Sequence, residues 1–136
     1  MNNLTRSNAL KIAAIIVLVL ALLDMIVFEL PDLMRGMDAV NQAANAGEGP
    51  PFFIVLLSFA FDILAIPAAY GAWRTQRWGV ILVIVISIYN SINGALGALF
   101  APWPAIRIIS GVSIIVYLGV IYLCLRREPK PLTDSV

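Results

Sequence analysis

The chain has 136 residues, of which 61% are hydrophobic and only 12% are charged, and its formal net charge is +1. Soluble domains average about 45–50% apolar and about 25% charged residues, so this composition predicts an integral membrane protein. The balanced charge gives no basic field that would hold nucleic acid, and the sequence has one cysteine, Cys124, and no histidine. We therefore expect no nucleic-acid partner, no cofactor and no metal site.

The first apolar segment covers residues 10–30, and the cations Arg6 and Lys11 lie at its start. A basic start before an apolar run is also typical of a secretory signal, and residues 44–46 have the small-x-small pattern of a cleavage site. That triplet lies far beyond the end of the run. We therefore expect the segment to stay in the protein as a helix.

An amphipathic pattern follows in the connection at residues 31–50. Pro31 suits the first turn of a helix and Gly47 suits its end. The apolar residues that recur at helical spacing are Leu30, Leu33, Met34, Met37, Val40 and Ala44. The pattern predicts a short amphipathic helix in the first extracytoplasmic loop, which either covers the outer end of the bundle or serves as a lid or docking element.

Three further apolar segments, at about residues 51–73, 78–100 and 105–125, reach the roughly 20 residues that a helix needs to cross the hydrocarbon core. The connections between them are so short that neighbouring helices must run antiparallel. We predict an all-α membrane protein, an antiparallel up-down bundle of four transmembrane helices formed by residues 1–127. The polar, proline-rich residues 128–136 are expected to form a flexible cytoplasmic tail.

Lysine and arginine are distributed unequally between the two ends of these segments. Arg6, Lys11, Arg74, Arg77, Arg126, Arg127 and Lys130 lie on one side, and Arg35 and Arg107 lie on the other. The positive-inside rule then predicts a multi-pass protein of the plasma (inner) membrane with both termini in the cytoplasm. The same orientation places Glu29, Asp32, Asp38 and Glu48 on the outer face.

Two acidic residues lie inside apolar segments, Asp24 in the first and Asp62 in the second. A charge at the centre of a bilayer costs about 2.5–3.5 kcal/mol on insertion scales, and lipid cannot satisfy polar groups. Asn90, Asn93 and Ser113 lie at overlapping depths in the third and fourth segments. We expect these side chains to converge in the interior, with Asn90 beside Asp62 and either Asn93 or Ser113 beside Asp24.

Helical spacing supports this convergence, because a seam of small and polar residues allows two helices to approach closely. In the second segment the seam consists of Ser58, Asp62, Ala65 and Ala69. Arg107 lies near the start of the fourth segment. Its long side chain reaches either inward, as the counter-ion of Asp24, or outward to Glu29 or the lipid headgroups.

The polar layer has two interpretations. In the first, amides and hydroxyls satisfy protonated carboxyls, and the layer only holds the helices together. In the second, Asp24 and Asp62 bind a proton, a coupling cation or a cationic substrate, and Asn90 and Asn93 supply neutral ligands.

In size, in number of helices and in having an acidic residue in the first helix, the chain resembles the small multidrug resistance transporters. Asp24 is the residue that carries the resemblance, although that family has Glu at this position and this Asp24 lies closer to the outer end. The second acid, Asp62, and the outer amphipathic segment are departures from the family. The resemblance implies a homodimeric carrier.

The sequence favours a protein that is not an enzyme, because it contains no phosphate-binding loop and no recognisable pair of nucleophile and base. The first expectation is a small accessory or interaction subunit of a membrane assembly, in a homodimer or a larger complex, with the polar layer holding its bundle together. The alternative is a small dimeric proton- or cation-coupled carrier that uses Asp24 and Asp62.

Overall fold

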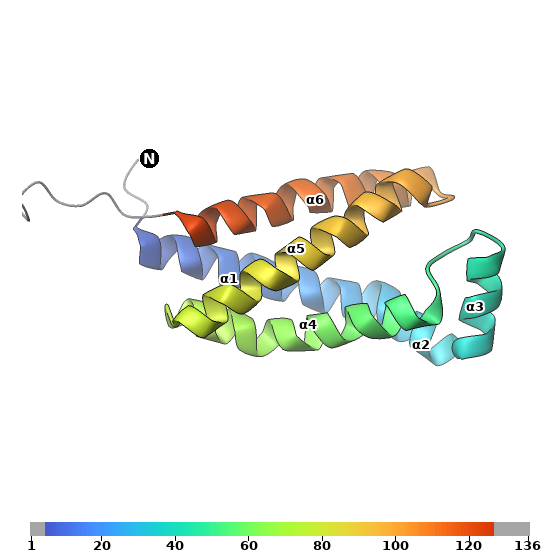
Figure 1. Ribbon diagram of the computed structural model, residues 1–136, viewed down its shortest axis with the longest axis horizontal. Coiled ribbons are helices and arrows are strands. Elements are labelled where there is room, and N and C mark those ends of the chain that lie inside the picture. Colours follow the sequence, from blue (N-terminus) through green and yellow to red (C-terminus); the bar gives the residue numbers. More distant parts are fainter. Residues whose placement is uncertain (1–4, 127–136) are drawn as a thin grey trace, which may run out of the picture.

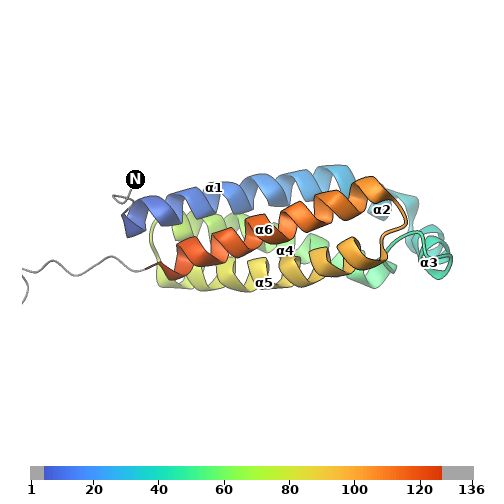
Figure 2. The same cartoon turned by 90° about the horizontal axis from the view of Figure 1, so that it is seen from above.

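The computed structural model describes residues 5–126, which form helices and their connections. Four helices are long and apolar enough to cross a membrane (Figures 1 and 2): Arg6–Arg35, α4 (Phe52–Trp73), α5 (Arg77–Phe100) and α6 (Pro104–Leu125). The all-helical class with four candidate spanning helices is thereby confirmed. The tail expected at residues 128–136 lies outside the described part of the chain.

The first spanning helix changes its geometry along its length. It consists of α1 (Arg6–Asp24), a wide π-helical turn called η1 (Met25–Glu29) and α2 (Leu30–Arg35). Thr5 caps its start, since its Oγ1 accepts a hydrogen bond from the Asn8 N–H. The helix thus begins before the predicted segment and ends after it.

The predicted end at residue 30 is wrong because Pro31 continues the first helix instead of starting a new one. Proline has no N–H to donate to the carbonyl four residues earlier, which is that of Val27. The wide turn lies just before Pro31, where this hydrogen bond is missing. At the end of the turn the Leu30 N–H donates to the Met25 carbonyl, five residues back. The helix stops at Gly36, whose φ of 91° favours glycine.

A short helix, α3 (Met37–Asn45), follows Gly36 and lies across the end of the bundle opposite the first residues of α1 (Figures 1 and 2). Its Val40 is buried, and its Asn41 Oδ1 accepts a hydrogen bond of 3.0 Å from the Phe52 N–H at the start of α4. Gly47 ends α3 with a φ of 76° and with paired bonds back to the last turn. The loop helix therefore begins after Gly36 and not at Pro31.

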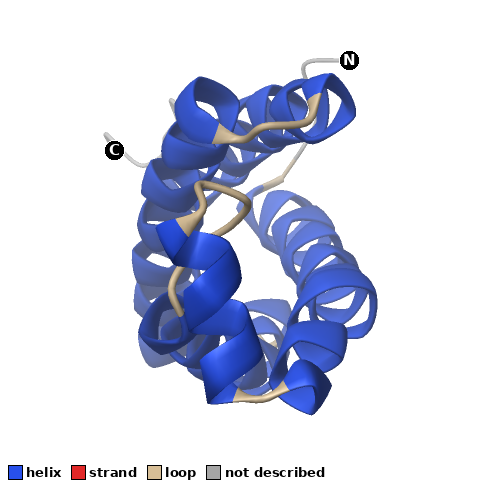
Figure 3. Ribbon diagram, turned by 90° about the vertical axis from the view of Figure 1, so that its right-hand side faces the viewer, coloured by secondary structure: helices blue, strands red, loops and turns tan. Residues whose placement is uncertain are grey.

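The four spanning helices enclose a common interior, seen end-on in Figure 3. The first helix packs against α4 and α6, and α5 packs against the same two helices. Glycines set both contacts of α5. A Cβ on Gly79 would lie 2.5 Å from the Ala72 backbone nitrogen in α4, and a Cβ on Gly97 would lie 2.6 Å from the Ser110 Oγ in α6. Because of these close approaches, α5 crosses diagonally from α4 to α6 (Figure 1).

The interior divides into an apolar half and a polar half. The apolar half lies nearest the first residue of α1 and the last residue of α6 and is built mainly from alanine and valine. Its buried members are Leu10, Ala13, Ala14, Val17, Ala21, Ala65, Ala68, Ala69, Ala72, Val80, Val83, Ile86, Val120 and Cys124. Toward α3 this packing gives way to buried acids, amides and hydroxyls.

Candidate functional site

Asp62 lies in α4 where the apolar half meets the polar half, and it is 1% exposed. Ser58, Ala65 and Ala69 on the same face of α4 are also buried, as the helical spacing predicted. The Asp62 Oδ1 has no hydrogen-bond partner among the described residues. An unpartnered carboxyl oxygen in a protein interior is costly and rare, so this atom requires a functional or structural reason.

Glu29 was expected on the outer surface, and the structure corrects this expectation. Its side chain is 7% exposed, and its carboxyl lies within hydrogen-bonding reach of the Asp62 carboxyl. The Glu29 Oε2, like the Asp62 Oδ1, has no hydrogen-bond partner among residues 5–126. The two acids therefore form a carboxyl pair between the first helix and α4.

The wide turn η1 explains why Glu29 points inward. In a regular α-helix, residues five apart such as Asp24 and Glu29 point in directions that differ by about 140°. A π-helical turn contains more residues than an α-helical turn, and this reduces the angle between them. Both acids consequently lie on the side of the first helix that faces α4, and each interacts electrostatically with Asp62.

Helix α5 contributes Ser87 and Asn90, which are 0% and 8% exposed. The Asn90 side chain lies near the Asp62 carboxyl, so the structure brings these two residues together as the sequence predicted. The Asn90 Nδ2 and the Ser87 Oγ nevertheless lack a hydrogen-bond partner among the described residues. The carboxyl pair is thus bordered by polar atoms with unused capacity to donate or accept hydrogen bonds.

Asp24 and Tyr117 complete the site. We call the site the acidic cluster, and it consists of the three acids Asp24, Glu29 and Asp62 and their neighbours Asn90 and Tyr117. Asp24 is partly buried on α1, and Tyr117 is a buried residue of α6. Tyr117 lies near all three acids. Every spanning helix therefore contributes to the cluster. Sequence reasoning missed Tyr117, because a tyrosine inside an apolar segment gives no signal that distinguishes it from a packing residue.

Two other residues that the sequence suggested for the site form hydrogen bonds away from the acidic cluster. Asn93 donates to the Ser58 Oγ at 3.4 Å, and the Ser58 Oγ lies 2.9 Å from the Tyr89 hydroxyl. Ser113 donates to the Ile109 carbonyl of its own helix at 2.9 Å, as serines inside apolar helices commonly do. Neither of the two expected partners of Asp24 is therefore bonded to it.

Arg107 also lies away from the acidic cluster. Its side chain is exposed, and its Nε donates to the Ala101 carbonyl just before α6. This bond satisfies the carbonyl of the C-cap residue of α5, so Arg107 is held outside the bundle and does not act as the counter-ion of Asp24. The ion pair found among the described residues joins Arg35 to Asp32, at 3.2 Å, in the last turn of the first helix.

The chemistry open to the acidic cluster follows from its composition. Two neighbouring carboxyls cannot both be ionised at low cost in a protein interior, but they can share one proton. Within residues 5–126, no group of three or more His, Cys, Asp or Glu side chains is arranged to hold a metal ion. A carboxyl pair of this kind is chemically suited to bind and release a proton.

No family model, no curated protein and no solved structure matches this chain.

Proposed function

We propose that this protein is a small proton- or cation-coupled membrane carrier in which the Glu29–Asp62 pair binds and releases the coupling ion. One observation carries the proposal: two buried carboxyls face each other and each has an oxygen without a partner among the described residues. Intramembrane acids commonly mark proton and ion pathways. The site includes Asp24 and Asn90, as the sequence suggested, and Glu29 in addition.

The alternative that this layer only holds the helices together fits the unpartnered atoms less well. A structural network gains its stability from satisfied hydrogen bonds, and each buried polar group left unpaired costs about 1–3 kcal/mol. Four of the buried polar residues have such atoms, namely Glu29, Asp62, Ser87 and Asn90. The apolar half of the same bundle is built from apolar side chains, which carry none of this cost.

Proton binding by the carboxyl pair supplies a physical basis for coupling proton movement to substrate movement. With one shared proton, Glu29 and Asp62 attract each other and draw the first helix toward α4. Without it, two like charges repel each other in a medium of low dielectric. The wide turn η1 lies at this contact, and π-helical turns are frequent at functional sites because their hydrogen bonds can rearrange locally. Movement at η1 would connect proton binding to the passage of a substrate.

The distribution of basic residues supports an orientation with both termini in the cytoplasm. Arg6, Arg74, Arg77 and Arg126 lie at the end of the bundle where α1 begins, and this excess of arginine is typical of the cytoplasmic side. In this orientation α3 lies at the outer surface, and the acidic cluster lies between the middle of the membrane and that surface.

The proposal is tested by proton flux in proteoliposomes that contain a pH-sensitive dye. Asp62→Asn and Glu29→Gln should each lower the flux at least about tenfold, since each removes a proton-binding carboxyl from the interior. Asp32→Asn is the matched control, because Asp32 lies in the same first helix but pairs with Arg35 at its end, and it should retain the flux. Equal flux in all three variants, or no flux in the folded wild-type protein, would contradict the proposal.

A second candidate function is that of an interaction subunit, either in a homodimer or in a larger membrane assembly. It is favoured by α6, which is the least buried of the four spanning helices. A Cβ on Gly111 or Gly119 of α6 would meet no atom of the described chain within 4 Å, so another helix can approach this face closely. Native mass spectrometry in mild detergent tests this candidate, and a strictly monomeric, partnerless preparation would contradict it.

A further inference from the structure

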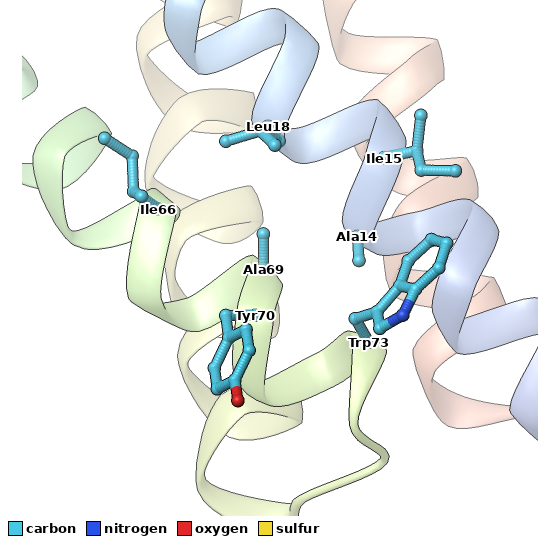
Figure 4. A pocket seen from close by; sticks show the side chains of 7 residues that line it. All are labelled: Ala14, Ile15, Leu18, Ile66, Ala69, Tyr70 and Trp73. Atoms are coloured by element: carbon cyan, nitrogen blue, oxygen red, sulfur yellow. The ribbon is translucent and has the colours of Figure 1, made fainter.

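An apolar groove runs along the outside of the bundle between the first helix and α4 (Figure 4). It has a volume of about 330 Å³ and is lined by Ala14, Ile15 and Leu18 of α1 and by Ile66, Ala69, Tyr70 and Trp73 of α4. Ile15, Ile66 and Tyr70 are exposed, so the groove is open on the side that faces the lipid. It lies in the apolar half of the bundle and is separate from the acidic cluster.

Two cations border the end of this groove. The Lys11 Nζ lies 5.5 Å from the centre of the Trp73 ring, and the Arg74 Cζ lies 5.9 Å from the centre of the Tyr70 ring. The Arg74 Nη1 also donates to the Tyr70 hydroxyl at 3.3 Å. Within the described part of the chain neither cation pairs with a carboxylate. Both side chains are therefore fixed by aromatic residues of the groove while their charges remain uncompensated.

The sequence places the cations and the groove on the same helix faces. Lys11 precedes Ile15 by one turn on α1, and Arg74 follows Tyr70 by one turn on α4. From Lys11 to Leu18 the rise is about 10 Å, which is most of the roughly 15 Å depth of one hydrocarbon leaflet. The groove thus leads from two positive charges at the membrane surface into the hydrocarbon of one leaflet.

We propose that this groove binds an anionic phospholipid, with an acyl chain along the groove and the headgroup phosphate between Lys11 and Arg74. Any lipid tail can fill an apolar groove, but only an anionic headgroup compensates both cations. Basic pockets between transmembrane helices select anionic lipids in this way. The exposed aromatic rings of Tyr70 and Trp73 lie beside the glycerol region, where such rings are favoured.

The first experiment measures lipid selectivity by thermal unfolding of the full chain in detergent, with phosphatidylglycerol or phosphatidylcholine added at equal mole fraction. Phosphatidylglycerol should raise the melting temperature more than phosphatidylcholine does. The apparent affinity for phosphatidylglycerol should fall about fivefold in Lys11→Gln or Arg74→Gln and about 30-fold in the double variant. Arg77→Gln is the matched control, because Arg77 is a nearby cation that does not border the groove, and it should behave as wild type.

The second experiment locates the lipid with Trp73 as the sole tryptophan, in the variant Trp78→Phe, Trp103→Phe. Phosphatidylglycerol with brominated acyl chains should quench Trp73 fluorescence more strongly than brominated phosphatidylcholine. This difference should disappear when Lys11→Gln and Arg74→Gln are added. Equal quenching by the two lipids in the variant that keeps Lys11 and Arg74 would overturn the proposal. So would a loss of lipid selectivity in Arg77→Gln as large as that in Lys11→Gln or Arg74→Gln. If the tryptophan variant fails to fold, the thermal experiment on the chain with all its tryptophans still decides the question.

Discussion

Glu29 of the first helix and Asp62 of α4 face each other in the interior of the bundle, and each carboxyl has an oxygen that bonds to no described residue. The pair lies where an apolar core of alanine and valine meets a layer of amides and hydroxyls. Burial keeps water from solvating the two acids, and their proximity disfavours two negative charges. The pair is therefore suited to hold one exchangeable proton.

The wide turn η1 should be necessary for this pairing. Pro31→Ala supplies an N–H that can donate to the Val27 carbonyl, so η1 should become regular α-helix, in which Glu29 lies about 140° from Asp24 and points away from Asp62. We expect proton flux to fall at least about tenfold while helix content, measured by circular dichroism, is retained. Val27→Ala leaves Pro31 in place and should keep the flux. If Pro31→Ala transports as wild type, η1 has no role in the site.

The hydroxyl network beside the acidic cluster should contribute modestly to stability. Tyr89→Phe removes the 2.9 Å bond to the Ser58 Oγ but keeps the ring, which stacks on Phe61 with centroids 4.2 Å apart. Unfolding in a detergent titration should show a loss of about 0.6–1 kcal/mol. Phe61→Leu tests the stacking separately. An unchanged free energy of unfolding in Tyr89→Phe would show that the Ser58 bond adds nothing.

The contact between α4 and α5 should not accept a methyl group at Gly79. A Cβ at this position would lie 2.5 Å from the Ala72 backbone nitrogen, and backbone cannot rotate out of the way as a side chain can. Gly79→Ala should therefore destabilise the protein by about 1–3 kcal/mol, as overpacking does elsewhere. Gly119→Ala is the control, because its Cβ would meet no atom within 4 Å. If the two variants were equally stable, Gly79 would not be a close contact between α4 and α5.

Arg107 should be dispensable for the acidic cluster. It donates to the carbonyl of Ala101, the C-cap residue of α5, and does not reach Asp24. Arg107→Gln should change the free energy of unfolding by less than about 0.5 kcal/mol and leave proton flux within about twofold of wild type. A loss of flux as large as that in Asp62→Asn would show that Arg107 does act at the acidic cluster.

Hydropathy and helical periodicity were sufficient to predict the spanning helices and the buried face of α4, because both signals arise directly from the exclusion of polar groups from lipid. The inward direction of Glu29 could not be predicted in the same way. It depends on a π-helical turn, and a sequence read with a constant period of 3.6 residues places Glu29 on another face. Pro31, directly after this turn, was the available signal, since its missing N–H favours an irregular turn before it.

The side-chain partners of the polar residues were less predictable than the depth of these residues in the membrane. Asn90 lies next to Asp62 as expected, but Asn93 bonds to Ser58. Depth follows from position along a helix. Pairing also depends on helix rotation and crossing angle, which here are set by close contacts at glycines such as Gly79 and Gly97.

The most direct test of the exchangeable proton is labelling of the folded protein in membranes with a hydrophobic carbodiimide, followed by peptide mass spectrometry. Carbodiimides in apolar surroundings react with protonated carboxyls. If Glu29 and Asp62 share a proton, one of them is modified at neutral pH and proton flux is lost in parallel, while Asp32, in its pair with Arg35, stays unmodified. Modification of Asp32 with both Glu29 and Asp62 left intact would contradict a proton-binding pair inside the bundle.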